Sequence, residues 1–236
     1  MTACRLYTII DDKSALIGDT PERQDGMNGV CAPGFDRLLD FMETGWQGDG
    51  TEIIYGIWPD FRLAYFNEGW VRFARENGGA PWLMSPECLG RSVLDVTTPE
   101  LRPFYRELFT RAITTVTARP YSISHEYECS SAEVYRKFAM LLFRLEGGQG
   151  LLIANSLVVE MPHAVRGTVP VEPGAGSVPY HNEHELVIQC AACRRIRHQQ
   201  LEGRWDWIPA WVSQPPERTS HGLCDLCMSY YYPAKV

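Results

Sequence analysis

The apolar residues between positions 98 and 116 repeat with the period of an α-helix. They fall three and four positions apart, which gathers them on one face of a helix. Thr98-Pro99 precedes the run, and proline is favoured in the first turn of a helix. The sequence therefore predicts a long helix that starts at this pair and packs one face on a core. That face consists of Leu101, Phe104, Tyr105, Leu108, Phe109, Ala112, Ile113 and Val116.

Two shorter helices are predicted upstream. The first follows Pro33-Gly34, after an N-terminal stretch without a sustained period, which we interpret as mostly irregular. The second begins after Asn67, a residue type that caps helix N-termini, and ends at Asn77-Gly78-Gly79. The apolar face of the first helix is Phe35, Leu38, Leu39 and Met42.

Five strands are expected around these helices. Two of them flank a Pro59-Asp60 turn, and three follow the long helix as a meander. In the first strand of the meander, alternation puts His125 on the face that should meet the long helix, so we expect it to point inward. The strands are Ile53–Trp58, Arg62–Phe66, Tyr121–Cys129, Val134–Leu145 and Leu151–Val159. The inward face of the third strand is Tyr121, Ile123, His125, Tyr127 and Cys129.

These elements divide the chain into four parts. Residues 1–52 form an N-terminal extension that contains the short amphipathic helix, and residues 53–160 form a compact α+β unit. Residues 161–182 are rich in proline and glycine, which indicates a linker. Residues 183–236 form a separate C-terminal module that contains four of the eight cysteines.

Composition and charge exclude several classes of protein. The chain of 236 residues is 45% hydrophobic and 22% charged, as in soluble globular proteins. Its net charge of -7 comes mostly from residues 1–52, and no part has the basic footprint of a nucleic-acid binder. No apolar run reaches the ~18 residues of a membrane span. Charges at Asp11-Asp12 come too early for a signal peptide, so a cytoplasmic location is expected.

Two cysteine pairs predict a metal site. Cys190 and Cys193 form one C-x-x-C pair, and Cys224 and Cys227 form another. Each pair offers two thiolates, and two pairs complete a tetrahedral Cys4 shell that leaves no open position for a substrate. We therefore expect structural zinc, with iron as the second choice of metal. Redox dithiols are an alternative for such pairs.

The segment around these cysteines resembles a cysteine module that follows PAS or receiver domains in bacterial signalling proteins. The matching stretches are Cys190–Arg197, Gly203-Arg204-Trp205, Ser220–Cys227 and Tyr231-Tyr232-Pro233. His221, three residues before Cys224, is interpreted as a hydrogen-bond donor to a ligand sulfur, with replacement of a thiolate as the alternative. Arginines after the first pair either bind an acidic partner or phosphate, or form a solvated face.

Residues 52–160 resemble a PAS domain. Ile57–Asn67 is similar to the opening of that family, in which two strands around an aspartate turn end in an asparagine helix cap. Gly90–Val96 is similar to its Gly-Arg/Lys-Ser-hydrophobic-hydrophobic-Asp segment. The resemblance implies an α+β PAS fold, a five-stranded antiparallel sheet with flanking helices, joined here to a small Cys4 zinc-binding module.

A PAS fold implies a possible ligand pocket, for which the candidates are His125, Tyr121, Tyr127 and Cys129. An inward histidine beside tyrosines can ligate heme or bind a small organic molecule, whereas a plain core histidine is the favoured interpretation. We expect a bacterial sensory or adaptor protein that acts through a protein partner or a homodimer. A docking subunit with an empty pocket is the alternative. No set of catalytic groups is recognisable, so an enzyme is not expected.

Overall fold

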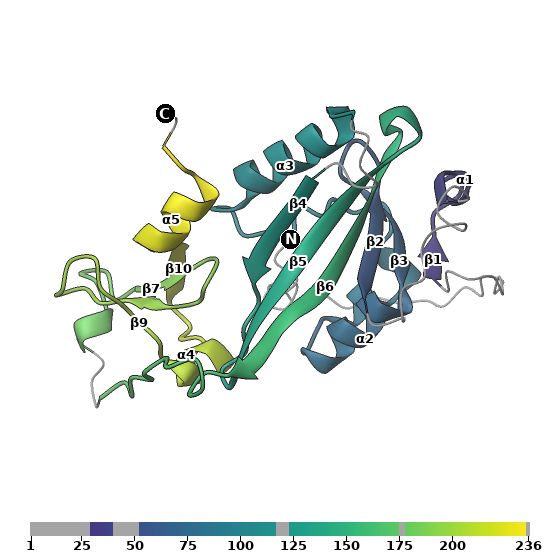
Figure 1. Cartoon of the computed structure of the whole chain (residues 1–236). Helices are drawn as coiled ribbons and strands as arrows, with labels where there is room; N and C mark the ends of the chain where they lie inside the picture. The colour runs from purple at the N-terminus through teal and green to yellow at the C-terminus, as the bar shows by residue number, and fades with distance from the viewer. Residues whose placement is uncertain (1–28, 40–51, 117–122, 175–177, 235–236) are drawn as a thin grey trace.

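The computed structural model describes residues 29–39, 52–116, 123–174 and 178–234, and shows a mixed α+β protein (Figure 1). Its larger sheet has six strands in the order β1-β3-β2-β6-β5-β4, and all neighbours are antiparallel. The strands are β1 (Gly29–Cys31), β2 (Ile53–Ile57), β3 (Leu63–Asn67), β4 (Ile123–Glu128), β5 (Val134–Leu145) and β6 (Gly150–Pro162).

Five of these strands are the predicted ones, and β1 is an addition. Its three residues lie in a stretch that we interpreted as irregular, and they pair with β3. Three residues are too few to show a period of two, so only the exposed edge of β3 determines that they form a strand. Residues 1–28 and 40–51 of the predicted N-terminal extension lie outside the described residues.

Helices cover one face of the larger sheet. They are α2 (Glu68–Glu76), α3 (Arg102–Thr114), and the 3-10 turns η3 (Pro81–Met84) and η4 (Pro86–Cys88). Asn67 caps α2 as predicted, because its side chain accepts the N–H of Trp70 at 3.0 Å. The predicted start of the long helix is wrong by three residues. Thr98 to Leu101 form a turn, and Pro103 is the proline in the first turn of α3.

Part of the other face of the sheet, around β2 and β3, is covered by the N-terminal segment. Phe35, which precedes α1 (Asp36–Leu39), is fully buried there together with Leu38. Glycine at position 56 allows this contact, since a Cβ would lie 2.3 Å from the Phe35 ring. Phe35, Leu38 and Leu39 of the predicted apolar face thus pack within the chain, and Met42 lies outside the described residues.

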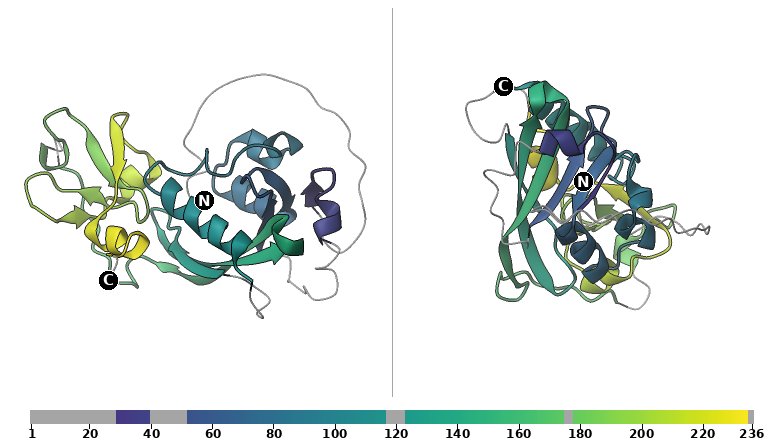
Figure 2. Two further views of the ribbon diagram at one scale, coloured as in Figure 1. Left: turned by 90° about the horizontal axis from the view of Figure 1, so that it is seen from above. Right: turned by 90° about the vertical axis from the view of Figure 1, so that its right-hand side faces the viewer.

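The C-terminal module contains a second, four-stranded sheet in the order β10-β7-β8-β9. Strands β10 and β7 are parallel and the other pairs are antiparallel. The elements are β7 (Val187–Cys190), β8 (Ile196–Arg197), β9 (Trp205–Asp206), β10 (Thr219–Gly222), α4 (Pro209–Ser213), α5 (Asp225–Tyr231) and η6 (Val178–Tyr180). The module lies at one end of the larger sheet, beside the start of α3 (Figure 2).

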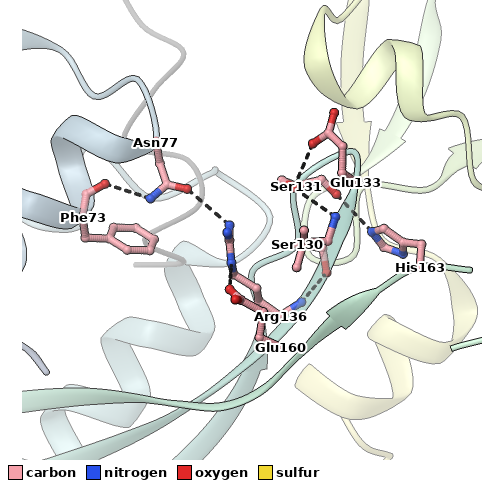
Figure 3. A network of polar contacts seen from close by, with 9 residues as sticks. Phe73, Asn77, Ser130, Ser131, Glu133, Arg136, Glu160 and His163 are labelled. Atoms are coloured by element: carbon pink, nitrogen blue, oxygen red, sulfur yellow. Dashed lines mark hydrogen bonds and ion pairs between the residues drawn. The ribbon is translucent and has the colours of Figure 1, made fainter. Parts of the chain in front are cut away.

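Part of the predicted linker packs between the two sheets. Strand β6 continues to Pro162, and the ring of buried His163 lies 4.2 Å from that of Trp207. The backbone N–H of Val171 donates to the carbonyl of Trp207 at 2.8 Å. On the other side, His163 Nε2 lies 3.0 Å from the carbonyl oxygen of Ser131, in the turn between β4 and β5 (Figure 3).

A polar network braces that turn. Arg136 donates to Glu160 at 2.6 Å across β5 and β6, and its backbone N–H donates to the Ser130 hydroxyl at 3.2 Å (Figure 3). Ser131 and Glu133 are joined at 3.2 Å. These bonds hold the turn in place where the module contacts it.

None of the helices that the structure describes is long and apolar enough to cross a membrane.

Candidate metal centre

The four paired cysteines converge at the junction of the two sheets. Their sulfur atoms all lie within 4.8 Å of one another, and all four residues are buried. Cys193 Sγ and Cys224 Sγ are 3.7 Å apart. A tetrahedral Zn²⁺ with Zn–S bonds of about 2.3 Å separates its sulfurs by about 3.8 Å. Cys193 and Cys224, which are 31 positions apart along the chain, thus lie at the spacing of a tetrahedral edge.

The first pair is shaped by the hairpin between β7 and β8. Cys190 ends β7, and its backbone N–H donates to the carbonyl of Arg195 at 2.7 Å. The turn is closed by Arg194, whose φ of 65° lies in the left-handed region, which is strained for a residue with a side chain. The Arg194 guanidinium donates to the Val212 carbonyl at 2.8 Å. This bond to the end of α4 helps to hold the strained turn.

The second pair lies at the N-terminus of α5. Cys224 is the N-cap residue and Cys227 is in the first turn, where unpaired backbone N–H groups favour negative charge. The N–H of Cys224 points at Cys190 Sγ, at 3.4 Å. The N–H of Ala191 donates to the Gly222 carbonyl at 2.7 Å, which joins the two pairs through their backbones. Both pairs are therefore positioned by hydrogen bonds of the chain itself.

Crowding perturbs the protonation of the four thiols. Hydrogen bonds from Cys193, Cys224 and Cys227 hold the pKa of Cys190 far below its usual range. Contacts with Cys190, followed by Cys224, raise the pKa of Cys193. The pKa of Cys227 is raised too, first by its contact with Cys190. Protons are therefore shared among the sulfurs, and a metal ion that binds all four as thiolates displaces them.

Arg195 places a positive charge beside the sulfurs. Its burial lowers its pKa, but the neighbouring Cys193, followed by Glu128, outweighs that effect, so the pKa of Arg195 is raised. Four thiolates around a divalent ion carry a net charge of -2, which a half-buried guanidinium offsets. Glu128 lies at the end of β4, so this charge also connects the cysteines with the larger sheet.

The donor set fits a closed, structural ion site. Four buried thiolates at tetrahedral spacing suit zinc and fill its coordination sphere. The ion would contribute folding free energy to the module and would leave no position for a reacting molecule. His221, the predicted donor to a sulfur, lies half-buried on β10 opposite Gln189 of β7, and its role toward the sulfurs stays a prediction.

The predicted pocket residues lie at the same junction. The ring of His125 is half-buried, and burial lowers its pKa to about 4, so it is neutral at pH 7. Tyr127 donates its hydroxyl to Asn155 at 3.0 Å, and Cys129 is buried nearby. Tyr121 lies outside the described residues. The His125 ring contacts those of Phe104, Tyr105, Tyr127, Tyr230 and Tyr231.

The contacts that α5 makes with the larger unit were not predicted from the sequence. Tyr230 and Tyr231 pack on His125, although the C-terminal module was expected to be separate. The signal was present as a run of three tyrosines, Tyr230 to Tyr232, at the end of an otherwise short apolar segment. Nothing in the sequence, however, identifies the surface that such rings cover.

Two hollows occur elsewhere on the described surface. One of about 650 Å³ runs along the outer side of α3, where its lining includes Arg102, Arg106 and Arg111. The other, of about 380 Å³, is bordered by Arg166, Arg195 and Trp207, among others. Neither is lined by His125, Tyr127 or Cys129.

No protein-family model matches this chain, and no curated protein matches it.

Proposed function

We propose that this chain is a cytoplasmic sensory or adaptor protein of bacterial signal transduction. In this proposal residues 53–160 are a PAS domain that binds a small ligand, and the cysteine module holds a structural zinc ion and relays or anchors the response. The proposal includes no catalysis at the metal, because the four cysteines would fill its coordination sphere. A protein partner, or a second copy of the chain, would receive the signal.

The order of elements supports the PAS part of the proposal. Two strands, a helix, two short turns, a long helix and a three-stranded meander follow one another from β2 to β6, in the order expected for that family. The five strands form one antiparallel sheet with α2 and α3 on a single face. The two stretches that resemble the family, Ile57–Asn67 and Gly90–Val96, lie in this unit.

Polar atoms without a hydrogen-bond partner inside the core support the proposal that the PAS domain binds a ligand. The hydroxyls of Tyr55 and Tyr105 and the Nε2 atom of His125 are buried and have no hydrogen-bond partner among the described residues. Each such group costs about 1–3 kcal/mol unless something pairs with it. Burial, followed by Tyr231, Tyr127, Tyr55 and Cys129, raises the pKa of Tyr105, so these polar groups are close neighbours. A small molecule with donor and acceptor groups would satisfy them.

A docking subunit without a ligand is the second candidate. The position of the two hollows favours it, since both lie outside the candidate pocket. In that case the aromatic rings around His125 serve as core, and the surfaces of the chain bind a partner within a larger assembly.

The experiment is to denature the freshly purified protein and identify any released molecule by mass spectrometry, together with an absorption spectrum. Tyr105→Phe removes one unpartnered hydroxyl and keeps the ring. Tyr135→Phe, whose ring packs under Arg166 at 3.8 Å, is the matched control. We expect a bound organic molecule in the wild type and control, and less of it in Tyr105→Phe.

Other results would change the proposal. A strong Soret band that His125→Ala abolishes would identify the ligand as heme. The absence of any released molecule, together with a partner that is retained by Tyr105→Phe, would favour the docking subunit. Equal amounts of ligand in both variants would place the ligand elsewhere.

A further inference from the structure

Three consecutive tyrosines of the C-terminal module contact three sites on the larger α+β unit. Tyr230 donates its hydroxyl to the carbonyl of Glu126 in β4 at 2.8 Å. The ring of Tyr231 lies 5.0 Å from that of Phe104 in α3, nearly perpendicular to it. Tyr232 donates to the carbonyl of Glu100 at 2.6 Å, just before α3. The end of α5 is therefore fixed to both β4 and α3.

Tyr232 also completes the N-terminus of α3. This helix has Leu101 at its N-cap, which cannot accept a hydrogen bond through its side chain. The backbone N–H of Phe104, one of the first-turn donors without a partner in the helix, donates instead to the Tyr232 hydroxyl at 3.3 Å. A residue far along the chain thus supplies the cap that the sequence around position 101 lacks.

The same short helix carries two of the metal ligands. Cys224 caps α5 and Cys227 lies in its first turn, while Tyr231 comes four residues later on the same side of the helix. Both Cys227 and Tyr231 belong to the apolar cluster that contains Tyr105 and Phe109. The ligand-bearing side of α5 therefore continues directly into its docking side.

A helix of seven residues is not stable by itself in water. The order of α5 must come from its two attachments, the cysteine cluster at its start and the tyrosine contacts at its end. Strengthening one attachment pre-orders the helix for the other. Two sites that share one such element are coupled, and the coupling acts equally in both directions.

We propose that α5 is a metal-dependent strap that couples the Cys4 site to the face of the larger unit formed by Phe104 and His125. A metal ion on the cysteines holds α5 against α3 and β4, and contacts at Phe104 in turn tighten metal binding. When the ion leaves, the strap loosens, the cap on α3 is lost, and the rings of Phe104 and His125 become accessible. This inference rests on the proposed metal site, and it identifies the path by which the module would relay a signal.

The test measures metal affinity and local exchange in the full chain. Zinc affinity is determined by competition with a chromophoric chelator in the wild type, in Phe104→Ala and in Tyr232→Phe, which removes a single oxygen atom. Thr110→Ala, on the exposed side of α3, is the control. We expect Phe104→Ala to weaken zinc binding about five- to fiftyfold, as is usual for coupled sites, and Thr110→Ala to leave it unchanged.

Hydrogen exchange gives the reverse measurement. Removal of zinc should speed exchange at the amide of Phe104 and in β4, while the amides of β5 and β6 stay protected. Tyr232→Phe should speed exchange at Phe104 even with zinc bound. If Phe104→Ala binds zinc as tightly as the wild type and exchange at Phe104 ignores zinc, α5 is no strap. A wild-type chain that binds no stoichiometric zinc would instead refute the metal site itself, and the coupling with it.

Discussion

The two sheets of this protein are stabilised in different ways. The larger sheet is buried on one face by α2 and α3 around fully buried rings such as Phe66, Tyr105 and Phe109. The module has an apolar cluster of four buried residues, Tyr180, Val187, Ile196 and Ile208. So small a core supplies little stability, and small domains of this kind usually depend on a metal or disulfides. The cysteine cluster is what distinguishes the two regions.

The two regions also share part of their packing. The four cysteines belong to the same apolar cluster as α3, and Ala132 of the β4–β5 turn packs with Trp207 and Val212 of the module. The module thus uses the larger unit as part of its core. The position of the cysteine cluster is therefore set by the larger unit as well as by the module.

Removal of the metal should have the largest effect. Structural zinc contributes apparent binding free energies of about 10–16 kcal/mol in small modules. We expect about one zinc per chain, and Cys193→Ser or Cys227→Ser to lower the zinc content and unfold the region after residue 183. Elemental analysis and limited proteolysis measure both. Cys31→Ser, outside the cluster, is the control. A module that stays folded without metal would remove the distinction between the two regions.

A cavity in the larger core is the converse change. Phe109 is fully buried and packs on Tyr105 and Phe61, so Phe109→Ala should lower the free energy of unfolding by about 3–5 kcal/mol. Urea unfolding measures this, with exposed Thr110→Ala as the control. The folded fraction should keep its zinc. A parallel loss of zinc affinity would show that the two regions unfold as one unit.

Acidification should weaken only the metal-dependent region. The raised pKa values of Cys193 and Cys227 mean that these thiols keep their protons in the metal-free fold at neutral pH. Zinc must displace them, so its affinity should fall as the pH falls, by about ten- to a hundredfold per unit for one or two protons. Chelator competition between pH 6 and 8 checks the slope. A flat profile would mean that the thiols are already ionised.

Loss of a helix cap in the larger unit should have the smallest effect. Asn67 accepts the N–H groups of Trp70 and Ile54, each at 3.0 Å, and donates to the carbonyl of Glu52 at 2.9 Å. Asn67→Ala should cost about 1 kcal/mol in urea unfolding. Asn67→Asp keeps the acceptor but places an oxygen against the Glu52 carbonyl, so it should be destabilising as well. Zinc affinity should not change in either variant. A change would extend the coupling beyond the contacts of α5.

Sequence patterns were sufficient where the interaction is local. The strands β2 to β6 follow from runs of strand-forming residues between turns, the cap of α2 from Asn67, and the grouping of the cysteines from two C-x-x-C spacings. They were insufficient for the start of α3. Pro99 suggests the first turn of a helix, but it lies in a turn that precedes the helix. They also missed β1, since a strand of three residues depends on its neighbour.

The sequence by itself determined most elements of the larger unit and the grouping of the four cysteines, because both depend on residue types at short, regular spacings. Only the tertiary structure decided that the site lies against α3 and β4. The hydroxyl of Tyr230 finds its acceptor 104 positions away and that of Tyr232 finds one 132 positions away. A tyrosine offers the same ring and hydroxyl to any surface, so its partner is selected by which surfaces the rest of the chain brings near.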